Sequence, residues 1–164
     1  MSAPLADWAN FFLAEVGASA VLAGLVVVAV SVNLSRILSF PQLPARAGVS
    51  LTMLTAALIL ASFGLMPGQG MVTFGTEVSA IGLVTLLVGL YNQLQSLASI
   101  EGMTPQKKLL RALVMAAATF PFVIGGTMLL FGFNGGLYWA AIGLLISLVV
   151  GVWNAWILLI EIMR

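Results

Sequence analysis

The chain has 164 residues, of which 62% are hydrophobic and only 7% are charged. A water-soluble domain has about 25% charged residues, so this composition predicts a protein of the lipid bilayer. Six basic residues and a net charge of +1 are too few to form a surface for nucleic acid. Cysteine and histidine are absent, which excludes disulfides, iron–sulfur clusters and the commonest metal, haem and general-base chemistry. We therefore expect no cofactor, no bound metal and no enzymatic activity.

Five apolar stretches are each long enough to cross a bilayer as a helix, which needs about 20 residues. In chain order they cover about residues 8–38, 46–66, 71–99, 107–131 and 137–162. Proline or glycine residues punctuate each connection. Strands are not expected, because none of the stretches alternates between polar and apolar residues. The sequence therefore predicts an all-α integral membrane protein, with residues 1–164 forming one transmembrane domain of five helices.

The basic residues predict the orientation of these helices. In a five-helix topology they all lie on one side of the membrane: Arg36, Arg46, Lys107, Lys108, Arg111 and Arg164. Because basic loops stay on the cytoplasmic side, we expect the N-terminus outside and the C-terminus in the cytoplasm. We therefore predict a multi-pass protein of the cell inner membrane, with the general composition of small bacterial proteins of that membrane.

Two of the predicted helices contain similar segments. Residues 83–92 (LVTLLVGLYN) align without a gap with residues 145–154 (LISLVVGVWN), and five of the ten positions are identical. Both segments end a helix of the same predicted direction. The second and third helices and the fourth and fifth are therefore predicted to be a duplicated helical hairpin that follows a lone first helix. The alternative is chance similarity between apolar helices.

Small residues recur every seven positions on the first and third helices, and at spacings of three and four on the fifth. Such stripes let helix backbones approach closely in lipid. We expect at least two of the three stripes to pack within the chain, and the alternative is contact with another subunit. The glycines that we assign to helix packing are Gly17, Gly24, Gly75, Gly82, Gly89, Gly143 and Gly151.

Pro121 interrupts the fourth predicted helix and leaves the carbonyl of Ala117 without its usual hydrogen bond. Gly125 and Gly126 follow about one turn later. We expect a simple kink at this proline, and the alternative is a hinge that gates a pore.

Two glutamates and three asparagines are the candidates for contact with an ion. Glu15 and Glu77 are predicted near the outer ends of their helices, where they either form an acidic mouth that attracts cations or simply face water. Asn33, Asn92 and Asn154 each lie near the cytoplasmic end of a helix. We favour hydrogen bonds between these asparagines as helix contacts, and the alternative is that they line the inner end of a pore.

Two functions are compatible with these features. The first is a homo-oligomeric permeation protein, a cation channel whose pore lies on the symmetry axis, with glutamates at the outer mouth and asparagines at the inner end. The alternative is a non-catalytic accessory or scaffold subunit of a bacterial membrane complex, whose small-residue stripes bind another membrane protein. The expected partners are the lipid bilayer, other copies of the chain and, in the accessory role, a second membrane protein.

Overall fold

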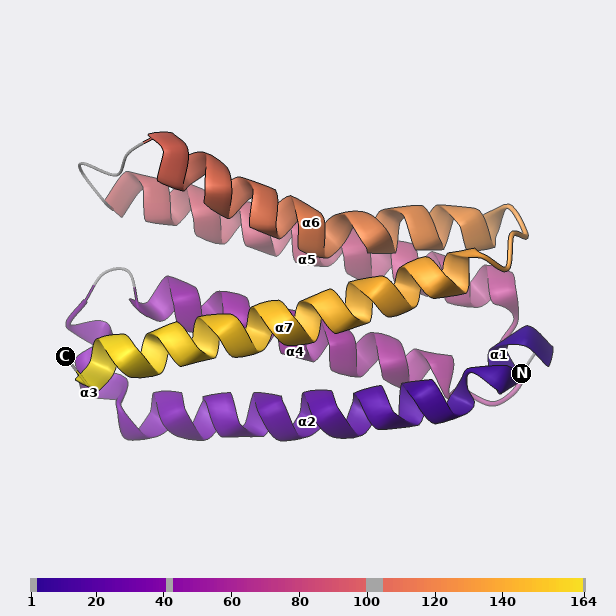
Figure 1. Ribbon diagram of the computed structural model, residues 1–164, viewed down its shortest axis with the longest axis horizontal. Helices are drawn as coiled ribbons and strands as arrows, with labels where there is room; N and C mark the ends of the chain where they lie inside the picture. Colours follow the sequence, from indigo (N-terminus) through magenta and orange to yellow (C-terminus); the bar gives the residue numbers. More distant parts are fainter. Residues whose placement is uncertain (1–2, 41–42, 100–104, 164) are drawn as a thin grey trace.

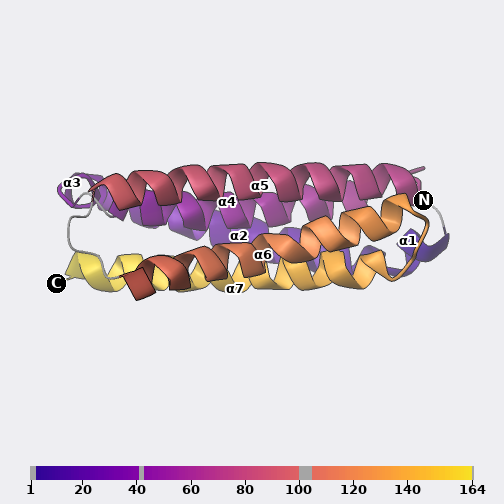
Figure 2. The same ribbon diagram turned by 90° about the horizontal axis from the view of Figure 1, so that it is seen from above.

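The structure, a computed structural model, describes residues 3–40, 43–99 and 105–163, and within these ranges every regular element is a helix. The long helices run alternately in opposite directions and form an elongated bundle (Figure 1, Figure 2). In chain order the helices are α1 (Ala3–Asp7), α2 (Ala9–Val32), α3 (Leu34–Leu38), α4 (Leu43–Gly64), α5 (Met71–Ser99), α6 (Pro105–Leu130) and α7 (Gly136–Met163).

Four helical segments are long and apolar enough to cross a bilayer. Each has 21 to 25 residues, and a helix of that length spans about 30 Å or more, the thickness of the hydrocarbon core. The segments are Ala9–Val32, Leu43–Gly64, Met71–Tyr91 and Gly136–Ile160. In the described part of α6, the apolar stretch Thr119–Leu130 is shorter than these four segments. The chain is therefore an all-helical protein suited to a membrane, and the fifth span stays a prediction.

Two helix boundaries differ from those predicted. The predicted helix over residues 8–38 is divided at Asn33, which has φ −110° and ψ 20° and separates α2 from α3. The Asn33 side-chain Nδ2 donates to the carbonyl oxygen of Ala29 at 2.9 Å, a local bond of the kind that competes with regular helix. The next helix begins earlier than residue 46, at Leu43, because the first turn of a helix tolerates a proline such as Pro44.

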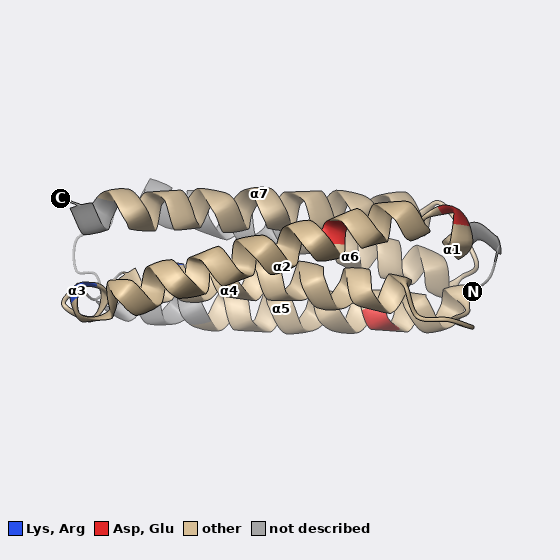
Figure 3. Ribbon diagram, turned by 90° about the horizontal axis from the view of Figure 1, so that it is seen from below, with Lys and Arg blue, Asp and Glu red and all other residues tan. Residues whose placement is uncertain are grey.

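The two ends of the bundle differ in charge. We call the end that contains α1 and the α4–α5 and α6–α7 connections the α1 end, and the opposite end, which contains α3, the α3 end (Figure 1). The acidic residues whose side chains the structure describes lie toward the α1 end, Asp7 in α1 and Glu15 and Glu77 in the second turns of α2 and α5 (Figure 3). The basic residues whose side chains the structure describes, Arg36 and Arg46, lie at the α3 end.

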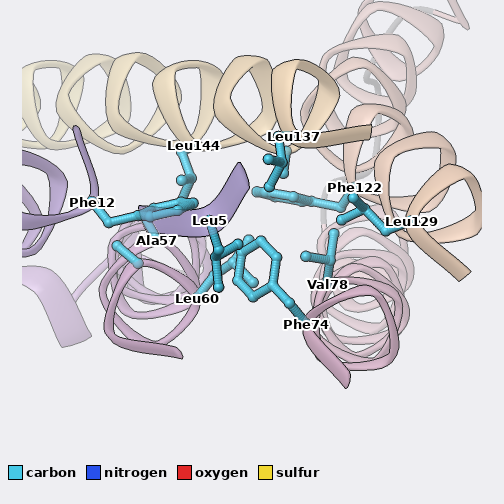
Figure 4. Close-up of a cluster of buried hydrophobic side chains, with 12 residues drawn as sticks. Leu5, Phe12, Ala57, Leu60, Phe74, Val78, Phe122, Leu129, Leu137 and Leu144 are labelled. Carbon is cyan, nitrogen blue, oxygen red and sulfur yellow. The ribbon is translucent and has the colours of Figure 1, made fainter. Parts of the chain in front are cut away.

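The helices pack most completely in the half of the bundle near the α1 end. All the helices except α3 contribute to one cluster of buried side chains there (Figure 4). The rings of Phe12 and Phe74, from α2 and α5, meet with their centroids 5.4 Å apart. The cluster consists of Leu5, Phe12, Ala57, Leu60, Ala61, Phe74, Val78, Phe122, Leu129, Leu137, Ala140 and Leu144.

Toward the α3 end the bundle opens into two groups of helices. A small cluster joins α3, α4 and α7 through Ile37, Leu43, Ala47 and Leu158. The α5–α6 pair diverges from these helices in the same direction (Figure 1). The half near the α1 end is therefore the part of the described chain in which α2, α4, α5, α6 and α7 share one core.

α2 covers one side of the bundle and exposes most of its surface. Four of its residues are buried, and more than half of its residues, mainly apolar ones, are exposed. An apolar surface of this kind suits contact with lipid tails or with another membrane helix. The large hydrophobic side chains that α2 exposes are Leu13, Val21, Leu25, Val27, Val28 and Val32.

Candidate functional site

Glu15 is the most deeply buried acidic residue in the described part of the chain. It lies in the second turn of α2, only 5% of its surface is exposed, and its Oε2 atom has no hydrogen-bond partner. Phe12, Glu15 and Ser19 are all buried and are spaced three and four residues apart, so they lie on one face of α2. α2 packs against α4 and α7. The structure therefore buries Glu15 within the bundle, whereas a mouth or a water-facing position would expose it.

Three serines are buried in α2, α4 and α7. The Ser19 hydroxyl donates to the carbonyl oxygen of Glu15 at 2.6 Å, within α2. Ser147 on α7 is completely buried, and its Oγ atom has no hydrogen-bond partner. A third buried serine, Ser50, donates to the carbonyl oxygen of Gly151 at 2.6 Å and so links α4 to α7. Ser147 therefore differs from the other two in having an unused hydroxyl.

Contacts of two glycines set the heights of these residues along the bundle. A Cβ atom on Gly64 of α4 would lie 2.6 Å from the ring of Phe12, so these residues are level. A Cβ atom on Gly151 of α7 would lie 2.7 Å from Leu54 of α4, so these are also level. At a rise of 1.5 Å per residue, Ser147 lies about 5 Å from Glu15 along the bundle axis, within one helical turn.

Glu77 has a different environment from Glu15. Its carboxylate accepts a hydrogen bond from the side-chain Nε2 of Gln69, a residue of the connection between α4 and α5. Gln69 is buried, and its other side-chain atom, Oε1, has no partner. α4 packs against both α2 and α5 and lies between them (Figure 1). The structure thus separates Glu77 from Glu15 and holds it against its own connection.

The asparagines bond within their own helices. Asn154 Nδ2 donates to the carbonyl oxygen of Val150 at 2.9 Å, and Asn33 makes the equivalent bond to Ala29. Both asparagines are half-buried and lie toward the α3 end. The side chain of Asn92 lies outside the described part of the chain. The side-chain amides of Asn33 and Asn154 therefore bond to carbonyl oxygens of their own helices, and the structure shows no hydrogen bond between these two side chains.

The glycines of α5 and α7 lie at contacts within the chain. A Cβ atom on Gly82 of α5 would lie 2.9 Å from Phe122 Cβ, and one on Gly75 would lie 2.8 Å from Leu129 Cβ, both on α6. A Cβ atom on Gly143 of α7 would lie 2.6 Å from the Phe122 ring. Gly89 and Gly151 are also buried. These two stripes therefore bring α5 and α7 close to their neighbours.

The glycines of α2 do not lie at contacts within the described chain. A Cβ atom on Gly17 or Gly24 would meet nothing within 4 Å, and both residues are exposed. Ser31, the next member of this stripe, is exposed and bonds to the carbonyl oxygen of Val27. The first-helix stripe therefore faces away from the rest of the chain.

Pro121 lies inside α6 and is buried beside Phe122. The axis of α6 changes direction near its middle (Figure 1). A proline that removes one helix hydrogen bond explains a kink of this kind.

Three residues of this region were missed as site residues from the sequence, namely Ser19, Ser147 and Gln69. The spacing of four between Glu15 and Ser19 is a signal that could have placed them on one face. No local signal relates Ser147 to Glu15, because they are on different helices. Among the described residues, no three histidine, cysteine, aspartate or glutamate side chains lie close enough to hold a metal ion together.

Comparison of the chain with protein-family models, with curated proteins and with solved structures finds no match. A function for this chain therefore has to be inferred from its own residues.

Proposed function

We propose that the chain is a cation-permeation protein of the membrane, a cation channel assembled from several copies, in which Glu15 contacts the ion. The observation that carries this proposal is the buried Glu15 carboxyl with its unpartnered Oε2. Ionisable groups inside membrane helices cost up to about 2.5–3.5 kcal/mol at the helix centre and usually serve ion or substrate pathways. Glu77 is the weaker candidate, because Gln69 already occupies its carboxylate.

The proposed ion path differs from one on a symmetry axis. Because Glu15 is buried on the side of α2 that packs against α4 and α7, the path follows the interface of these three helices. The exposed face of α2 is then free to contact another copy of the chain, through the surface around Gly17 and Gly24.

The proposal keeps the five-span topology, with the N-terminus outside and the α3 end in the cytoplasm of a cell with an inner membrane. Its support is the separation of charge, with Arg36 and Arg46 at the α3 end and Glu15 and Glu77 toward the α1 end. α6 has 26 residues and runs beside α5, long enough for a fifth span. Lys107 occurs at its start, at the α3 end.

The proposal also keeps the duplicated hairpin. The same offset of 62 residues relates Leu83 to Leu145 and the first residue of α4, Leu43, to the first residue of α6, Pro105. Within the aligned segments the buried and exposed positions recur in the same order: Thr85 and Ser147 are buried, as are Gly89 and Gly151, whereas Leu87, Val149, Tyr91 and Trp153 are exposed. This agreement supports a common origin for the two hairpins.

Cation flux into liposomes tests the proposed function. We expect Glu15→Gln to reduce flux at least about tenfold, because a hydrogen bond or ion contact with a charged group contributes about 1.5–3 kcal/mol. Glu77→Gln is the matched control, and we expect it to change flux less than about threefold, since its carboxylate contacts Gln69. Equal flux for Glu15→Gln and the unmodified protein, at equal reconstitution, would contradict the proposal.

The accessory role is the second candidate, and the exposed stripe on α2 favours it. Nothing in the described chain covers Gly17 or Gly24. If another membrane protein binds there, native mass spectrometry of gently extracted protein will show a mixed complex, and Gly24→Leu will dissociate it. A complex of identical copies that Gly24→Leu dissociates would instead support the homo-oligomer.

A further inference from the structure

We propose that the interface of α2, α4 and α7 contains a binding site for one monovalent cation, a proton or a sodium ion, formed by the Glu15 carboxyl and the Ser147 hydroxyl. This inference deepens the proposed function, since it names the ion class and a second ligand at the same place. It begins from two buried polar atoms without partners, Glu15 Oε2 and Ser147 Oγ. Buried polar atoms in proteins nearly always have a hydrogen-bond partner, so two such atoms on packed helices indicate a missing ligand.

The two residues lie on helices that run in the same direction (Figure 1). The register set by Gly64 and Gly151 places their residues about one turn apart along the bundle. The buried α4 residues at this height are Ala57, Leu60 and Ala61, whose apolar side chains offer no hydrogen bond. The buried side chains of α4 at this height therefore offer Glu15 and Ser147 no hydrogen-bond partner.

Ser147 is available as a ligand because its hydroxyl does not bond to its own helix. Thr85, the residue aligned with Ser147 in the other similar segment, donates to the carbonyl oxygen of Ile81 at 2.6 Å. Ser19 and Ser50 are likewise occupied, by the carbonyl oxygens of Glu15 and Gly151. Of the three buried serines in the described chain, Ser147 can accept a hydrogen bond from the protonated Glu15 carboxyl or contact a cation without breaking an existing bond.

The number of carboxyl groups identifies the charge of the ligand. A divalent cation such as Ca²⁺ takes six to eight oxygen ligands, often from several carboxylates. Glu15 contributes a single carboxylate, and among the described residues it belongs to no group of three or more acidic side chains that could hold a metal ion. One positive charge neutralises it, whether as a proton bound to the carboxyl or as a sodium ion between the carboxylate and the hydroxyl.

No charged residue of α4 or α7 with a described side chain lies at this height. Around α2, the charged residues with described side chains are Asp7 of α1, Arg36 of α3, Arg46 of α4 and Glu77 of α5, and α7 adds the titratable Tyr138. Glu77 accepts a hydrogen bond from Gln69, and the others belong to the ends of their helices. The side chain of Glu161 lies outside the described residues. In the part of α2, α4 and α7 that the structure describes, the charge of Glu15 is thus balanced by a bound ligand.

A hydrophobic carbodiimide tests this site in the full-length protein in detergent, without any measurement of flux. The reagent modifies carboxyl groups in their protonated form, and mass spectrometry of peptides quantifies the labelling of Glu15. We expect Glu15 to be labelled at low pH. If the ligand is sodium, added NaCl at constant ionic strength will protect Glu15 while KCl will not. If the ligand is a proton, labelling will decline as the pH rises and will not respond to sodium.

Ser147→Ala tests the second ligand, and Ser62→Ala is its matched control, since Ser62 is exposed and bonds to its own helix. We expect Ser147→Ala to shift the midpoint of protection, in pH or in sodium concentration, by about three- to tenfold, the worth of one hydrogen bond. Ser62→Ala should leave the midpoint unchanged. An equal midpoint for both variants would overturn the role of Ser147.

The unmodified protein can overturn the proposal without any variant. Labelling of Glu15 that does not respond to sodium and follows pH with the same midpoint as labelling of the exposed Asp7, or no labelling at any pH, would show that no cation is specifically bound there. The outcome is independent of the proposed permeation. If labelling of Glu15 depends on the ligand but the protein shows no cation flux, the site is supported and permeation is rejected. If cation flux requires Glu15 but labelling does not depend on the ligand, permeation is supported and the site is rejected.

Discussion

The glycine stripes of α2 and α5 have the same seven-residue spacing in the sequence and differ in their surroundings. Gly82 of α5 is buried, and a Cβ atom there would lie 2.9 Å from Phe122 Cβ. Gly24 of α2 is exposed, and a Cβ atom there would meet nothing within 4 Å. Repeats of small residues thus identify helix faces that can approach another helix closely. Whether that helix belongs to the same chain is decided by the path of the connections.

The largest expected effect on stability is at Gly126 of α6, where the backbone of α6 lies against the backbone of α5. A Cβ atom on Gly126 would lie 2.8 Å from the backbone nitrogen of Ser79 and 3.0 Å from the carbonyl oxygen of Gly75. Because neither atom can move without shifting α5, we expect Gly126→Ala to reduce the free energy of unfolding by about 3 kcal/mol. Unfolding in mixed detergent micelles measures this. A loss below about 0.5 kcal/mol would show that α5 and α6 are not in backbone contact.

An intermediate effect is expected at Gly143 of α7, where the neighbour is a side chain. A Cβ atom on Gly143 would lie 2.6 Å from the ring of Phe122. We expect Gly143→Ala to cost about 1–2 kcal/mol, since the ring must move. Phe122→Leu in the same chain should recover part of that loss, with a coupling of at least about 1 kcal/mol in a double-mutant cycle of unfolding free energies. Additive effects of the two substitutions would place the ring elsewhere.

The smallest effect is expected at Gly24 of α2. Because nothing lies within 4 Å of the added methyl group, Gly24→Ala should change the free energy of unfolding of the single chain by less than about 0.5 kcal/mol. The higher helix propensity of alanine favours a slight gain. Unfolding of the monomeric form in detergent checks this value. A loss comparable to that of Gly126→Ala would mean that another part of the same chain covers α2.

Much of the helical architecture is predictable from the sequence, because the length of an apolar run is a local property. The runs that became α4, α5 and α7 were located within a few residues of their observed bounds. The division between α2 and α3 was not predicted, since it depends on a single side chain, Asn33, bonding to its own helix backbone.

The candidate site was only half predictable. Glu15 is recognisable in the sequence as an ionisable residue within an apolar helix, the type of residue that marks functional positions in membranes. Its burial was not predictable, because the face of α2 that packs inward depends on the positions of α4 and α7. The bond between Gln69 and Glu77 was missed for a similar reason, as it requires the connection before α5 to fold back over the helix.

The sequence by itself determined that the chain is helical, apolar and asymmetric in charge, because composition, run length and the order of charged residues do not depend on tertiary contacts. Only the tertiary structure decided which of the similar glycines are covered and that Ser147 lies within about one turn of the level of Glu15. Residues so far apart in the chain become neighbours through the packing of whole helices, and the number of residues between them contains no information about which helix faces meet.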